Sequence, residues 1–267
     1  MLSYPLLMQS FREIRKNFLI FAALMLGGTA LWFGIYHPGI TDTLQALTAS
    51  LSTQMLAAFG LDFSIGSLTE FVSFGLFGFF LLILPLGYEV MAASQLIASG
   101  IDSGIFVYLI ATPNARATIA CTRGACLAGS TGILFLLTGI CGEICAAVQF
   151  PGQLDEPVFW QLLAGCFFLH ALLGGIAFFA ACRGKNMRTF VLAGAGIPVA
   201  FLLLHMLAAT GGMWGILRFG TVFTLFDIEA ILAGEGICFL YMALLCAGAV
   251  VLYALGVNSF RKRDLAI

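Results

Sequence analysis

The sequence predicts an all-α integral membrane protein with six transmembrane helices, an N-terminal interfacial helix, and both termini in the cytoplasm. The first observation is composition: 61% of the 267 residues are hydrophobic, 9% are charged, and the mean hydropathy is +1.05. A soluble domain carries about 25% charged residues, so this chain has too few charges to cover a water-soluble globule. The second observation is that the apolar residues form six long runs, and the third is an uneven distribution of basic residues between those runs.

Each of the six runs is long enough to cross a bilayer as a helix, which takes about 20 mostly apolar residues. Inside hydrocarbon the backbone must satisfy its own hydrogen bonds, which favours helices. The runs are too long and continuous for the short alternating strands of a β-barrel. Within one membrane domain of residues 1–267, the predicted spans are Phe18–Tyr36, Phe71–Ala93, Cys126–Val148, Phe159–Ala181, Thr189–Ala209 and Ile237–Val257.

The basic residues predict the orientation, because Lys and Arg are enriched in cytoplasmic segments. With the N-terminus inside, only Arg218 of the twelve basic residues lies outside. The inner ones are Arg12, Arg15, Lys16, Arg116, Arg123, Arg183, Lys185, Arg188, Arg261, Lys262 and Arg263. We therefore expect a multi-pass protein of the cell membrane, in a prokaryote the cytoplasmic membrane.

Three segments outside the spans also have helical patterns. Near the N-terminus, apolar residues from Tyr4 to Phe18 share one face, and Arg12, Arg15 and Lys16 lie opposite. This pattern predicts a cytoplasmic interfacial helix that leads into the first span, with an ordinary basic flank as the alternative. The outer segment His37–Glu70 is expected to hold a second interfacial helix, and Thr210–Gly236 short helices that dip into the membrane.

The sequence lacks the common motifs of catalysis and of nucleotide or metal binding. G-x-x-x-x-G-K-[ST] and H-E-x-x-H are absent, as is any basic patch interleaved with aromatic residues. The eight cysteines form no C-x-x-C and are interpreted as small packing residues. We expect no catalytic residue, no metal site, no cofactor on this chain and no nucleic-acid partner.

Four ionisable residues fall within the predicted spans. Such residues are costly in hydrocarbon and are therefore functional candidates. Glu89, near the inner end of the second span, and Glu143, in the outer half of the third, are candidates for a translocation path. His170 and His205 are interpreted as neutral, hydrogen-bonded packing residues. A proton relay would require these groups to face one another.

The inner segment from Gln95 to Arg123 is long and only moderately polar. Gly104 interrupts it, Ile105–Ile110 is apolar, and Pro113 with Asn114 marks a turn. This pattern predicts a short helix held against the membrane face and presented to a cytoplasmic partner. A plain connector is the alternative.

Three motifs resemble those of ABC-2 type permease subunits. Gly104–Arg116 (GIFVYLIATPNAR) resembles the signature that joins the second and third spans in that family. Asn258–Leu265 (NSFRKRDL) resembles the C-terminal ending, and Phe226–Gly234 (FDIEAILAG) the stretch before the last span. One departure lies before Gly104, where the family usually has several acids and this chain has only Asp102.

The resemblance implies the membrane subunit of an ABC transporter, in most relatives an exporter. Such a subunit contacts membrane lipid, pairs with a second copy or a paralogue, and is driven by separate ATP-binding subunits that hold ATP and Mg²⁺. The residues it implies for coupling are Asp102, Gly104, Pro113, Arg116, Arg183, Lys185 and Arg188, together with the N-terminal helix that carries Arg12, Arg15 and Lys16.

Two other function classes stay open. A stand-alone secondary transporter would need coupling-ion groups near the midplane. The other class is a membrane enzyme or anchor, and for the enzyme the sequence shows no nucleophile, metal site or acid–base constellation. Small residues such as Gly27 and Gly28, or Gly174 and Gly175, would allow close helix packing, either within one subunit or between two.

Overall fold

The computed structural model describes residues 2–37, 39, 67–102, 115–184 and 186–262, and their regular elements are all helical. Within this part of the chain, six helices are long and apolar enough to cross a membrane, which is the predicted number. The single-element spans are α1 (Tyr4–Ile35), α8 (Arg116–Gln149), α9 (Glu156–Arg183) and α13 (Ile237–Arg261). The other two are composite.

The second and fifth spans combine α-helical and π-helical turns. The second runs through α4 (Leu68–Val72), η1 (Ser73–Phe80), α5 (Leu81–Ala93) and η2 (Ser94–Ala98), and α6 (Ser99–Asp102) follows. The fifth runs through α10 (Met187–Phe190), η3 (Val191–Ala195) and α11 (Gly196–Ala209). π-Turns inside helices are frequent at functional sites, so the second and fifth spans are candidates to carry a functional site.

Side-chain caps fix where several of these helices begin. Ser67 accepts a hydrogen bond from the backbone N–H of Glu70 at 3.2 Å, at the start of α4. Asp155 accepts from the N–H of Val158 at 3.3 Å at the start of α9. At α10, Asn186 and Thr189 form a reciprocal capping box. Each cap satisfies a backbone donor that the helix leaves free.

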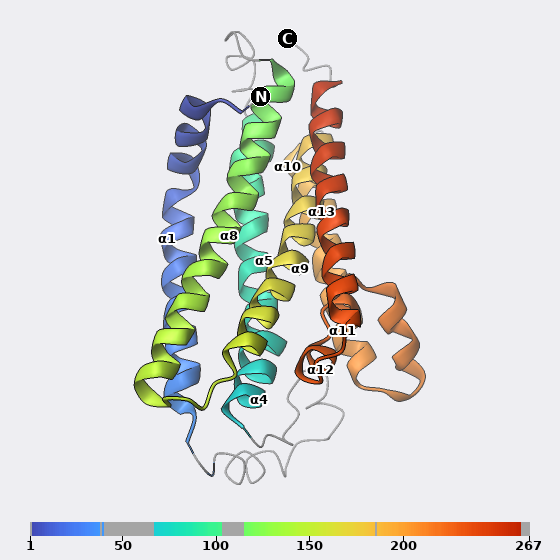
Figure 1. Cartoon of the computed structure of the whole chain (residues 1–267). Helices are drawn as coiled ribbons and strands as arrows, with labels where there is room; N and C mark the ends of the chain where they lie inside the picture. Colours follow the sequence, from blue (N-terminus) through green and yellow to red (C-terminus); the bar gives the residue numbers. More distant parts are fainter. Residues whose placement is uncertain (1, 38, 40–66, 103–114, 185, 263–267) are drawn as a thin grey trace.

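The long helices form one bundle, with α9 in its interior (Figure 1). α9 packs along α13 and α5, and α1 packs along α8. The most apolar windows of α9 and of the second span are 67% and 61% buried, whereas those of α1, the fifth span and α13 are 28%, 17% and 22% buried. A helix that is apolar all round lies in a protein core or in a membrane. We therefore expect the exposed apolar faces of α1, the fifth span and α13 to contact lipid or another protein.

Both described chain ends lie at the same end of the bundle (Figure 1), as an even number of spans requires. The basic residues follow the predicted asymmetry between the two ends. On the side of the termini, α1, α8, α9, α10 and α13 carry Arg12, Arg15, Lys16, Arg116, Arg123, Arg183, Arg188, Arg261 and Lys262. Arg218 follows α11 at the opposite end, in the 3₁₀ helix η4 (Gly212–Gly220).

The N-terminal amphipathic segment is not a separate helix, which corrects that expectation. α1 is continuous over 32 residues, about 48 Å at 1.5 Å per residue, against a hydrocarbon core of about 30 Å. Between Pro5 and Gly27 no residue breaks a helix, so the segment and the first span share one set of backbone hydrogen bonds. Arg12, Arg15 and Lys16 are exposed, and Tyr4, which belongs to the predicted apolar face, is 71% exposed.

The segment Thr210–Gly236, before the last span, does form short helices, as predicted. They are η4, the 3₁₀ helix η5 (Val222–Leu225) and α12 (Ile228–Leu232). Gly211 and Gly212, with φ of 76° and 60°, turn the chain after α11. The other predicted interfacial helix, between His37 and Glu70, falls mainly on residues 40–66 and so lies outside the described residues.

Candidate functional site

The interior of the bundle contains an acid–base pair at mid-span. Glu89 on α5 and His170 on α9 are both fully buried, and Oε2 of Glu89 lies 3.4 Å from Nδ1 of His170. His170 is at the middle of α9. A lone charged side chain at the centre of a span costs roughly 2.5–3.5 kcal/mol on insertion scales, so the pairing offsets a large penalty. Sequence reasoning identified Glu89 but not its partner.

A proline on α5 explains how His170 is held. Pro85 lies inside the helix and has no N–H, so the carbonyl of Leu81 lacks the helical donor four residues later. Nε2 of His170 lies 2.8 Å from that carbonyl oxygen. The Sγ of Cys166, one turn before His170, also approaches it, at 3.7 Å. Side chains of α9 thus complete a hydrogen-bond pattern that α5 leaves open.

This contact defines the tautomer of His170. A carbonyl oxygen only accepts, so Nε2 must carry a proton and donate it to Leu81. In a neutral ring Nδ1 is then a bare acceptor that faces a carboxyl oxygen of Glu89. A hydrogen bond between them needs one further proton, either on Oε2 of a neutral Glu89 or on Nδ1 of an imidazolium. In both forms the pair has no net charge.

The other side of the carboxyl group borders α13. A Cβ atom placed on Gly174 would lie 3.4 Å from Cδ of Glu89 and 3.2 Å from the hydroxyl of Tyr253. The glycine therefore leaves the space in which these two groups approach one another. Oε1 of Glu89 is buried and has no hydrogen-bond partner among the residues that the structure describes.

Glu143, the other predicted path residue, is not part of this site. Tyr88, next to Glu89, donates a hydrogen bond to Ser130 on α8 at 2.7 Å. Glu143 lies thirteen residues further along α8, about 20 Å at the helical rise, and it is half-buried. The structure therefore does not bring the two predicted carboxylates together; it joins Glu89 to a histidine that had been interpreted as a packing residue.

At the end of the bundle that holds the termini, a buried arginine joins three elements. Arg123 on α8 pairs with Glu13 on α1 at 3.3 Å and donates to the carbonyl oxygen of Leu96 in η2. Its side chain is 4% exposed, and that of Glu13 is 33% exposed. Sequence reasoning counted Arg123 only as a basic flank. Its place within apolar sequence, two turns after Arg116, was the available signal that it needs a partner.

The residues predicted to couple to a partner have mixed outcomes. Arg116 begins α8 and is half-buried, and Arg183 and Arg188 are exposed at the same end of the bundle. Asp102 ends α6, but its side chain lies outside what the structure describes. Gly104, Pro113 and Lys185 also fall outside the described residues, so the predicted short helix at Ile105–Ile110 stays a prediction.

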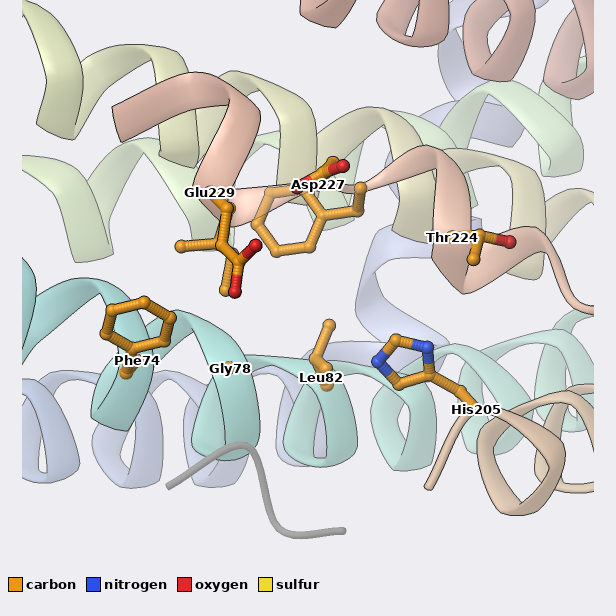
Figure 2. A pocket seen from close by; sticks show the side chains of 9 residues that line it. Phe74, Gly78, Leu82, His205, Thr224, Asp227 and Glu229 are labelled. Atoms are coloured by element: carbon orange, nitrogen blue, oxygen red, sulfur yellow. The ribbon is translucent and has the colours of Figure 1, made fainter. Parts of the chain in front are cut away.

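A pocket of about 220 Å³ opens near the other end of the bundle. Figure 2 shows Asp227 and Glu229 across it from Phe74, Gly78 and Leu82, with His205 and Thr224 at one side. The ring of His205 stacks on Phe223 with centroids 5.6 Å apart, and Oδ1 of Asp227 caps α12 through the N–H of Ala230 at 3.1 Å. His205, predicted as a packing residue, thus both packs and lines this pocket.

Among the described residues, no group of three or more His, Cys, Asp or Glu side chains is arranged to hold a metal ion. The pair Glu89–His170 is the candidate site that the geometry defines best, because both partners are buried and their proton count is constrained. Comparison of the chain with protein-family models, with curated proteins and with solved structures found no match.

Proposed function

We propose that this chain is the membrane-spanning permease subunit of an ABC transporter, an exporter that a separate ATP-binding subunit drives. The end of the bundle that holds both termini faces the cytoplasm, and ATP and Mg²⁺ bind on the partner. The three sequence motifs that resemble ABC-2 permeases support the proposal, as does the absence of a nucleotide-binding motif from the sequence.

The observation on which the proposal depends is the arginine contact at the cytoplasmic end. Residues 103–114, the central part of the predicted coupling region Gln95–Arg116, are flanked by η2 with α6 on one side and by α8 on the other. Arg123 joins both flanks by its bond to Leu96, and it joins them to α1 through Glu13. A push on the coupling segment would therefore move three elements together, as transmission of force from an ATPase requires.

The exposed faces fit an assembly of two membrane subunits. α1, the fifth span and α13 are mostly unburied in the single chain, and their exposed residues include large apolar ones such as Leu31, Leu192 and Val250. A second copy or a paralogue would pack on part of this surface, and lipid on the rest. The transport path would then lie at the interface between the two subunits.

The test is co-purification with an identified partner. The chain is co-expressed with its neighbouring genes and purified through a tag on the membrane chain. We expect a stable complex with ATPase activity, and we expect Arg116→Glu to lower recovery of the ATPase subunit several-fold. Arg218→Glu, at the opposite end, is the matched control and leaves recovery unchanged.

Equal insertion of both variants into the membrane is checked by their yield and by protease accessibility. If no ATPase subunit is recovered with the unmodified chain, the proposal is wrong. If the complex forms and Arg116→Glu has no effect, the assignment of this end to coupling is wrong.

A stand-alone, ion-coupled transporter is the second candidate, and Glu89–His170 is the observation that favours it. Ion-coupled transporters bind the ion near the bilayer midplane, and His170 lies at the middle of a helix long enough to cross the membrane. Transport by the chain alone in proteoliposomes, driven by a proton gradient without ATP, would establish this candidate in place of the first.

A further inference from the structure

We propose that Glu89 and His170 form a proton-binding site in the membrane interior, and that release of its proton loosens the contact between α5 and α9. The proposal does not depend on the source of energy for transport, because it concerns only the groups within one chain. It would hold for an ATP-driven subunit and for an ion-coupled transporter.

The first step is the proton count. The bond from Nε2 of His170 to the Leu81 carbonyl fixes one ring proton, and the bond between Nδ1 and Glu89 needs one more. With that proton the pair is neutral and both atoms are satisfied. Its departure to water leaves a carboxylate beside the lone pair of Nδ1 and changes the net charge of the pair from 0 to −1.

The second step is that, among the described residues, the groups next to the pair carry no charge that compensates that change. The nearest titratable groups on the adjoining helices are Cys166 on α9, Tyr253 on α13, Tyr88 on α5 and Cys126 on α8, one turn before Ser130. α1 faces Tyr88 with the rings of Phe18 and Phe21. The arginine of this region, Arg123, is engaged by Glu13 and Leu96.

The third step links the charge to the helix contact. A buried carboxylate without a compensating charge is unfavourable unless water reaches it. Because both members of the pair are fully buried, water reaches the carboxylate only if the helices that enclose it, α5 and α9 among them, move apart. Oε1, which has no partner among the described residues, offers an acceptor for the first water molecule. The deprotonated site therefore favours an opened contact.

The proton itself is measured by infrared difference spectroscopy on the full-length chain in lipid nanodiscs. Raising the pH of the unmodified protein must remove one buried proton per chain. The signature is loss of either a carboxylic acid band or an imidazolium band, and the band that disappears shows which atom holds the proton. Loss of neither band contradicts the proposal without the use of any variant.

Two substitutions assign the band. Glu89→Gln keeps the size and a hydrogen-bonding group but cannot release the proton, so we expect the signal to disappear. Glu143→Gln removes the half-buried carboxyl of α8 and serves as the matched control, so the signal persists. If the signal survives Glu89→Gln, the proton belongs elsewhere and the proposal is wrong.

The opening of the contact is measured at Cys166, which bonds to the same Leu81 carbonyl. Two single-cysteine variants keep either Cys166 or Cys182, both fully buried on α9, and a membrane-permeant maleimide labels them across a pH series. The ratio of the two rates corrects for the ordinary rise of thiolate with pH. We expect the ratio of Cys166 to Cys182 labelling to rise several-fold on alkalisation, and to stay constant with Glu89→Gln. A constant ratio with Glu89 intact would overturn the coupling between proton release and opening.

Discussion

Arg123 on α8 contacts Glu13 on α1 at 3.3 Å while another of its nitrogens donates to the backbone carbonyl of Leu96. The two contacts differ in their exposure to solvent. Glu13 is 33% exposed, so solvent screens its attraction to the guanidinium, whereas Leu96 is fully buried. A buried carbonyl that loses its donor cannot turn to water instead.

This difference predicts that replacing Arg123 lowers the free energy of unfolding more than replacing Glu13 does. Arg123→Met loses both contacts and should lower the free energy of unfolding by about 2–4 kcal/mol, since bonds from charged donors contribute about 1.5–3 kcal/mol. Glu13→Gln keeps the bond to Leu96 and should cost about 1 kcal/mol or less, as for a largely solvated pair. Unfolding in mixed detergent micelles measures both. An equal or larger loss for Glu13→Gln would show that the ion pair is the dominant contact.

The spans were predictable because a helix in hydrocarbon requires a long run of apolar residues, and such runs are visible in the sequence. Each apolar run became a helix, but the structure extends α1 to Tyr4 and α8 to Arg116, well beyond the apolar runs. Hydropathy locates the part of a helix that lies in hydrocarbon, and helix ends depend instead on caps and on residues that break the backbone pattern. Sequence without Pro continues the helix in both cases, in α8 even through Gly124.

The site was predictable only in part, because pairing depends on how helices face one another. The rule that buried charges are costly identified Glu89 from sequence, and the same rule suggested Glu143, which lies elsewhere. His170 could be assigned as its partner only once α9 was packed against α5. A local signal did exist: Pro85 leaves the carbonyl of Leu81 without its helical donor, which calls for a donor from another helix.

The contact between His170 and α5 predicts an energetic coupling with Pro85. Pro85→Ala supplies a backbone N–H for the Leu81 carbonyl, so the bond from His170 to that oxygen becomes less important. We expect His170→Leu to be less destabilising in the Pro85→Ala background by about 1 kcal/mol, the usual net value of one hydrogen bond. A double-mutant cycle of unfolding free energies measures this coupling.

The control for that cycle replaces His170→Leu with Ser130→Ala. Ser130 contacts Tyr88 and not the Leu81 carbonyl, so its effect should add to that of Pro85→Ala within about 0.5 kcal/mol. If the His170 cycle is equally additive, the Leu81 carbonyl does not depend on the imidazole.

Two glycines of α8 predict opposite responses to the same substitution. A Cβ atom at Gly142 would lie 2.6 Å from the ring of Phe159 and 3.4 Å from that of Phe33, whereas one at Gly129 meets nothing within 4 Å. Both rings are buried, so Gly142→Ala should destabilise by about 1–3 kcal/mol through overpacking. Gly129→Ala should be neutral or stabilise by up to about 1 kcal/mol, the helix preference of Ala over Gly.

Thermal unfolding of the two variants in one detergent gives the comparison, because they share a helix and a substitution. Equal effects would mean that helix propensity, and not the contact with α9, determines the response of α8. The result also separates the roles of small residues. Gly142 allows packing within the chain, whereas Gly129 leaves a surface that lipid or a second subunit can cover.

The pocket lined by Asp227 and Glu229 predicts different roles for these two carboxylates. Oδ1 of Asp227 accepts the N–H of Ala230 and caps α12, while Glu229 is exposed and follows the cap. Asp227→Ala should therefore destabilise the segment before α13 by about 1 kcal/mol, the usual value of an N-cap. Asp227→Asn keeps a capping oxygen and should be close to neutral, and Glu229→Ala should leave the helix intact.

Hydrogen exchange of residues 226–236 measures this locally, without requiring the whole bundle to unfold. α12 has five residues, too few to persist without its cap and its packing through Ala230 and Ile231. Loss of the cap should therefore speed exchange at Ala230 about five-fold, which corresponds to about 1 kcal/mol. If Asp227→Asn speeds exchange as much as Asp227→Ala, then the charge of Asp227, and not its capping oxygen, holds this wall of the pocket in place.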